Sequence, residues 1–143
     1  MAAYCAEEEL DGFANFFIVQ AEEERFHAMK FFTLIGDLGQ RPIITGFEDP
    51  KNEFSSVQEL FELALEHEQF VTKRIHMLMD MARQENHHQT VSFLQWFIDE
   101  QVEEEANMSK ILRNIKRVGG EGYGILLIDQ ELAGRIFTPP AQA

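Results

Sequence analysis

Apolar residues recur every three or four positions over three long stretches of the chain. These stretches cover residues 11–38, 56–84 and 90–118. Such spacing places the apolar side chains on one face of an α-helix and differs from the strict alternation that is typical of a strand. The pattern predicts an all-α fold with three long helices and a short fourth helix over residues 125–137.

Local signals mark the ends of these helices. Asp11 is suited to be the N-cap of the first long helix. The second follows Ser56, and Glu59 lies three residues later, which is the spacing of a capping box. Gly119 opens a glycine-rich stretch that should stop the third helix.

Loop lengths constrain how the predicted helices are connected. Only a few residues near 86–89 separate the second helix from the third, so these two should form an antiparallel hairpin. Residues 40–54 can travel back along the first helix at roughly 3.3 Å per residue. The first two long helices should then run parallel, within a single domain over residues 1–143.

The composition narrows the class of function. The chain has 25 Asp and Glu residues against 12 Lys and Arg, a formal net charge of −13. An acidic surface repels a phosphate backbone and attracts cations, so we expect metal ions and not nucleic acid as partners.

The same sequence gives expectations for localisation. Cys5 is the only cysteine, which excludes an intrachain disulfide. The acidic start of the chain does not read as a secretory signal, and no apolar run approaches the roughly 20 residues that span a bilayer. We therefore expect a cytoplasmic protein with no membrane partner.

Polar residues interrupt the apolar face of each long helix near its middle. They are Glu24 and His27, then Glu68, then Gln101 and Glu104. A buried carboxylate is costly unless it is paired, and these helix faces supply no Lys or Arg. Carboxylates and imidazoles are ordinary metal ligands, and residues three apart share a helix face.

Each of these residues has a simpler interpretation when taken alone. A single Glu-x-x-His is more often a solvated pair or a hydrogen-bonded core histidine than a ligand set, and the same holds for the other positions. Their coincidence on three helices favours a metal centre. Beside it, Glu23, Glu100 and Glu103 could hold another cation.

Around these positions the chain resembles the ferritin family, specifically the bacterial non-haem ferritins. The resemblance runs through Gln20–Ala28, Glu66–Gln69 and Phe93–Glu105. It implies a ferritin-like helical bundle and a ferroxidase that oxidises Fe(II) with oxygen or peroxide at a di-iron centre. It also implies storage of ferric mineral inside a homo-oligomeric shell of 24 subunits.

The resemblance assigns a role to each candidate residue. Glu24 would bridge two irons, His27 would bind the first, and Glu68 and Glu104 would bind the second, with Gln101 as a polar neighbour. A third iron site would consist of Glu23, Glu100 and Glu103.

Two departures from the family pattern matter. Arg25 follows Glu24 where the haem-containing bacterioferritins have methionine, and Gln101-x-x-Glu104 replaces their second Glu-x-x-His, so no haem is expected. Family members also begin with another long helix. Residues 1–10 match only its last turn, so the first bundle helix is expected to be largely absent.

Two other functions stay open. One is a rubrerythrin-like di-iron peroxidase or oxidase, against which the lack of a second Glu-x-x-His and of any Cys-x-x-Cys weighs. The other is a non-catalytic helical assembly protein whose buried acids bind a redox-inert ion such as Zn(II), or serve only interface specificity.

Overall fold

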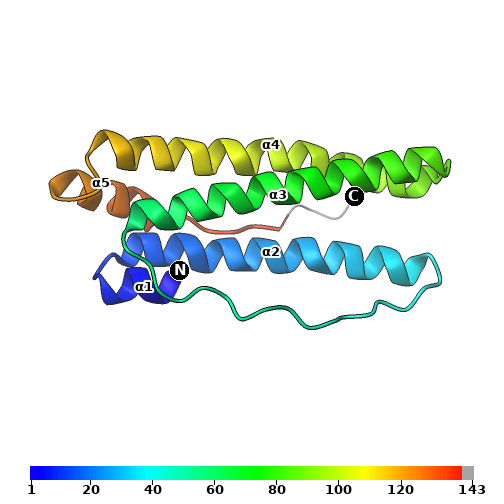
Figure 1. Cartoon of the computed structure of the whole chain (residues 1–143), viewed down its shortest axis with the longest axis horizontal. Coiled ribbons are helices and arrows are strands. Elements are labelled where there is room, and N and C mark those ends of the chain that lie inside the picture. Colours follow the sequence, from blue (N-terminus) through cyan, green and yellow to red (C-terminus); the bar gives the residue numbers. More distant parts are fainter. Residues whose placement is uncertain (140–143) are drawn as a thin grey trace. The chain divides into compact units, whose positions relative to one another are not determined.

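The computed structural model describes residues 1–139, and in that range the chain is entirely helical apart from turns and loops. Its helices are α1 (Ala2–Glu7), α2 (Asp11–Asp37), α3 (Val57–Gln84), α4 (His88–Arg117) and α5 (Tyr123–Leu132), as Figure 1 shows. The predicted all-α fold is confirmed. None of the described helices is both long and apolar enough to cross a membrane.

The chain divides into two compact units. The first contains Met1–Phe54 together with the chain from Ile125 onward, and the second contains Ser55–Gly124. The single domain and the parallel course of the first two long helices therefore stay predictions. The absence of a longer first helix also stays a prediction.

In the second unit, α3 and α4 pack against each other as the predicted hairpin (Figure 1). The turn between them is short because Asn86 adopts a left-handed φ of 55°, and the N–H of His87 then donates to the carbonyl of Ala82 at 2.8 Å. The His87 ring accepts a hydrogen bond from the N–H of Thr90, so α4 begins at His88, two residues before the predicted start. Fully buried side chains of Leu60, Phe61, Leu94, Met108 and Ile115 form the core of this unit.

In the first unit, α1 packs on α2. The long connection that follows α2 returns to the end at which α2 begins. The ring of Phe54, at the end of the connection, lies 5.7 Å from the ring of Tyr4 on α1. Residues 40–54 thus travel back along α2, as their length predicted (Figure 1). Cys5 is fully buried in α1, and this burial raises the pKa of its thiol to about 11.

The helix starts correct one prediction and refine another. Leu10, and not Asp11, is the N-cap of α2, and it makes no side-chain capping bond. Ser56 caps α3 as predicted, accepting from the N–H of Glu59 at 3.2 Å. The Glu59 carboxylate, however, accepts from the N–H and hydroxyl of Ser55, one residue earlier than in the standard capping box.

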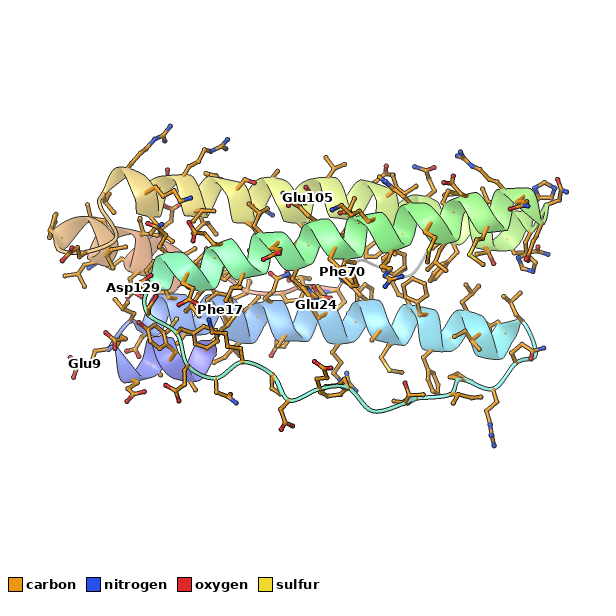
Figure 2. The ribbon with its side chains drawn as sticks, in the orientation of Figure 1. Glu9, Phe17, Glu24, Phe70, Glu105 and Asp129 are labelled. Carbon is orange, nitrogen blue, oxygen red and sulfur yellow. The ribbon has the colours of Figure 1, made fainter. Side chains whose placement is uncertain are left out.

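The position of α5 explains why α2 can begin without its own cap. The N–H of Phe13 donates to the Asp129 carboxylate of α5 at 2.9 Å, and Figure 2 shows Asp129 beside the first turns of α2. In return, the Asn15 amide donates to the carbonyls of Leu132, Ala133 and Arg135. The two helices cap each other.

This exchange also corrects the predicted end of the last helix. α5 ends at Leu132 and not at residue 137. The carbonyls of Leu132 and Ala133 receive their hydrogen bonds from the Asn15 amide, so a further helical turn is not needed to satisfy them. The chain beyond Leu132 is then available to follow α2.

Glycine at position 12 permits the close approach of α5. A Cβ atom placed on Gly12 would lie 1.7 Å from the carbonyl oxygen of Asp129, whereas one on Gly36 in the same helix would meet nothing within 4 Å. Gly12→Ala should therefore destabilise the chain by about 3 kcal/mol through overpacking. Gly36→Ala should stabilise it by about 0.5 to 1 kcal/mol because alanine favours a helix. Urea unfolding of both variants checks this, and equal shifts would contradict the tight docking of α5.

Candidate metal centre

The first unit places two of the predicted ligands together on α2. His27 and Glu24 lie one helical turn apart, and the Nδ1 atom of His27 is 3.5 Å from a carboxylate oxygen of Glu24. The His27 side chain is only 10% exposed, whereas that of Glu24 is 44% exposed. The sequence pattern placed both in the core, which is right for His27 and wrong for Glu24. An imidazole and a carboxylate at this separation can both reach one cation.

Three further candidates are buried in the second unit, one on α3 and two on α4. Glu68, Gln101 and Glu104 are each no more than 4% exposed. The Gln101 amide lies 3.2 Å from both the backbone carbonyl and a carboxylate oxygen of Glu68. Glu68 therefore has a hydrogen-bond donor as a partner, which lowers the cost of burying its carboxylate.

Two residues that sequence reasoning missed complete this network. The Gln101 amide also donates to the Thr72 hydroxyl at 3.3 Å, and that hydroxyl donates to a Glu105 carboxylate oxygen at 2.6 Å. Thr72 lies four residues after Glu68 on α3, so its spacing could have indicated that it shares the same helix face. Figure 2 shows Glu105 midway along α4.

On α4, two carboxylates approach each other. An oxygen of Glu100 and an oxygen of the buried Glu104 lie within 4.8 Å of one another. Residues four apart share a helix face, and two carboxylates at this distance attract a divalent cation. Glu103 lies between them in sequence and is exposed.

Glu23 has a partner that the sequence analysis did not assign. The guanidinium of Arg135, in the segment after α5, forms an ion pair with the Glu23 carboxylate, with both side chains largely buried. Arg135 also donates to the Gln20 amide oxygen at 2.8 Å. A basic residue from a distant part of the sequence thus reaches the face of α2 that carries Glu23.

The candidate ligands are thus divided between the two units. In the first unit, the adjacent Glu23 and Glu24 lie on α2 one turn before His27, and Figure 2 shows Glu24 midway along the helix. The second unit holds the others: Glu68, Glu100, Gln101, Glu103 and Glu104. The role of each as a metal ligand stays a prediction.

Comparisons with known proteins give a consistent result. Residues 1–118 match the ferritin-like domain family. A bacterial non-heme ferritin of Staphylococcus saprophyticus is 45% identical over 137 residues, which cover 96% of this chain and 82% of that protein. A bacterial non-heme ferritin of Staphylococcus epidermidis is also 45% identical, over 138 residues that cover 96% of this chain and 83% of that protein.

Solved structures show the same similarity. A closed form of the Archaeoglobus fulgidus ferritin, engineered by site-directed mutagenesis, has a TM-score of 0.93 and 43% identity, covering 96% of this chain and 84% of that one. A humanized archaeal ferritin has a TM-score of 0.95 and 42% identity, covering 97% of this chain and 84% of that one.

The Gln101 network yields a stability prediction. Gln101→Ala removes the donor that faces the buried Glu68, so it should lower the free energy of unfolding of the metal-free chain by about 1.5 to 3 kcal/mol. Gln95 on the same helix donates to Asp99 in an exposed pair, and Gln95→Ala should change the stability by less than about 0.5 kcal/mol. Chemical denaturation after chelation tests both. A Gln101→Ala variant as stable as Gln95→Ala would show that the Gln101 amide does not stabilise the buried Glu68 carboxylate.

Proposed function

Because the chain belongs to the ferritin family, we propose that it oxidises Fe(II) with oxygen or peroxide at a di-iron centre and stores the ferric product as mineral. The observation that carries this proposal is the set of candidate ligands found in a chain of this family. The Glu24–His27 pair lies on α2, and the buried acids Glu68 and Glu104 lie on α3 and α4. Oxygen and imidazole ligands of this kind suit iron.

The proposed roles follow from the chemistry of each side chain. Glu24 has a carboxylate with two oxygens and is more exposed than His27, which suits a bridge between two irons. His27 would hold the first iron, while Glu68 and Glu104 would hold the second. Each Fe(II) gives one electron to the oxidant, and the negative charge of the carboxylates favours the Fe(III) product.

Gln101 would act as a positioning residue in this scheme. Its amide is neutral, so it orients the Glu68 carboxylate without cancelling the negative charge that attracts iron. The Thr72 hydroxyl in turn fixes the amide and connects it to Glu105. Glu23, Glu100 and Glu103 would form a further cation site.

We also propose that the chain acts as a homo-oligomer that forms a shell. The connection between α2 and α3 carries three apolar side chains that are almost completely exposed: Ile43 at 78%, Ile44 at 87% and Phe47 at 91%. Apolar groups gathered on one surface segment mark an interaction surface or an aggregation hazard. A second copy of the chain is the partner that a shell requires.

Metal titration tests the proposed centre. Glu24→Ala should weaken Fe(II) or Zn(II) binding at both metal positions of the proposed centre, whereas His27→Ala should mainly weaken binding at one of them. Glu22→Ala, an exposed acid on the same helix, should change neither. Anaerobic calorimetry measures the stoichiometry, and equal stoichiometry in the wild type and Glu24→Ala would refute the bridging role.

The same protein separates an oxidase from an inert binder. When oxygen is admitted after anaerobic loading with Fe(II), the wild type should develop ferric absorbance much faster than Glu24→Ala. Binding of iron with no ferric absorbance above the buffer rate would favour the non-catalytic assembly protein.

Sedimentation velocity tests the assembly. A double variant with Ile44→Ser and Phe47→Ser should shift the wild-type oligomer to smaller species, because it removes apolar surface from the contact. Glu48→Ser, which changes an exposed neighbour, should leave the distribution unchanged. A wild-type chain that sediments as a monomer would contradict the proposed shell.

A further inference from the structure

The segment that follows α5 is held along α2 by contacts at several points. The Asn15 amide donates to the carbonyl of Arg135 at 3.0 Å, and the rings of Phe26 and Phe137 lie 5.7 Å apart. Residue numbers rise together on both sides of these contacts, so residues 133–137 run in the same direction as α2. This segment, residues 133–137, is called the strap below.

The face of α2 beneath the strap is built to receive a guanidinium group. The carbon centre of the Arg135 guanidinium lies 4.3 Å from the centroid of the Phe16 ring, and one of its N–H groups donates to Gln20 at 2.8 Å. The Glu23 carboxylate accepts from the other end of the group. Positions 16, 20 and 23 share one helix face, and they offer an aromatic surface, an amide oxygen and a carboxylate.

This ion pair is shielded from water. The Arg135 side chain is 21% exposed and the Glu23 side chain 16% exposed. Salt screens a partly buried pair much less than a surface pair, so the contact should persist at ordinary ionic strength. Removing either partner would leave the other charge partly desolvated.

The location of the pair gives it a consequence for cations. Glu23 is adjacent in sequence to Glu24 and lies one turn before His27, the two candidate ligands of the first unit. A carboxylate already neutralised by a guanidinium attracts a metal cation less, and the two cations would repel each other at close range. Glu23 therefore cannot bind the Arg135 guanidinium and a metal ion at the same time with full affinity for each.

We propose that the strap seats Arg135 on Glu23 as a resident cation, so that a metal ion takes Glu23 only by displacing Arg135 and releasing the strap. The proposal rests on the proposed function in treating Glu23 as a cation ligand. It adds an order of filling: a metal ion reaches Glu23 after Glu24 and His27, because at Glu23 it must first compete with the guanidinium of Arg135.

Trypsin provides a direct readout of the strap. The protease needs a free arginine side chain and a flexible backbone, and the bond between Arg135 and Ile136 meets this need only when Arg135 has left its place on α2. Lys51, in the exposed connection before α3, gives an internal reference for the protease. The quantity measured by mass spectrometry is the rate of the cut after Arg135 divided by the rate of the cut after Lys51.

Without metal, Glu23→Gln should raise this ratio roughly tenfold, because a charge-assisted hydrogen bond is lost. Arg135→Lys should also raise it, since an ammonium group has neither the planar fork nor the stacking surface of a guanidinium. Glu22→Gln, on the exposed side of α2, is the matched control and should not change it. A Glu23→Gln ratio equal to that of the wild type would refute the proposal that Glu23 holds the strap on α2.

Saturating Zn(II) should raise the ratio of the wild type towards that of Glu23→Gln and leave Glu23→Gln itself unchanged. Zn(II) binding is measured in parallel by calorimetry. Zn(II) binding without any change in the wild-type cleavage ratio would refute the competition between Zn(II) and Arg135 for Glu23, and it would leave the proposed function intact. Absence of Zn(II) binding would overturn both, and the metal-free Glu23→Gln result would still show whether Arg135 is seated on Glu23.

Discussion

A carboxylate removed from water needs a partner, and this requirement governs the polar contacts of both units. Burying an unpaired carboxylate costs several kcal/mol, so each one must find a hydrogen-bond donor or a positive charge. The chain meets the requirement in three ways. Glu68 faces the amide of Gln101, Glu23 faces the guanidinium of Arg135, and Asp129 accepts from the backbone N–H of Phe13. Among the described residues, no buried side-chain nitrogen or oxygen lacks a hydrogen-bond partner.

The nature of each partner decides what the carboxylate can still do. A neutral amide beside Glu68 satisfies the hydrogen-bonding needs of the acid and leaves its negative charge available to a metal ion. A guanidinium beside Glu23 neutralises the charge and makes the acid part of an ion pair. Asp129 is committed to an N-terminal helix end, where the helix dipole favours a negative charge. Three acids of similar chemistry therefore have three different roles: Glu68 keeps its charge available to a metal ion, Glu23 is held in an ion pair, and Asp129 caps a helix.

Contacts between distant parts of the sequence also set the helix ends of the first unit. α2 begins without a side-chain cap of its own because Asp129 supplies the acceptor, and α5 ends at Leu132 because Asn15 supplies the donor. This exchange needs the backbones to approach closely, which Gly12 allows. It also directs the chain after α5 along α2, which is how Arg135 reaches Glu23.

The sequence by itself determined the helical class, the hairpin of α3 and α4, and the return of residues 40–54 to the start of α2. These features depend on local periodicity, glycine stops and loop length, all of which can be read along one segment. It also marked Glu24, His27, Glu68, Gln101 and Glu104 through their polar character on apolar helix faces. Their resemblance to a ferritin ligand set led to the family that the comparisons show.

Only the tertiary structure decided that the partner of Glu68 is Gln101 and that the partner of Glu23 is Arg135. Arg135 is 112 positions from Glu23 in the sequence, and no local pattern links a residue after the last helix to a residue in the middle of α2. The same reason explains the two errors at the helix ends, Asp11 as a cap and residue 137 as an end. Helix signals describe a segment in isolation, whereas these ends are satisfied by side chains of another segment that folding brings beside them.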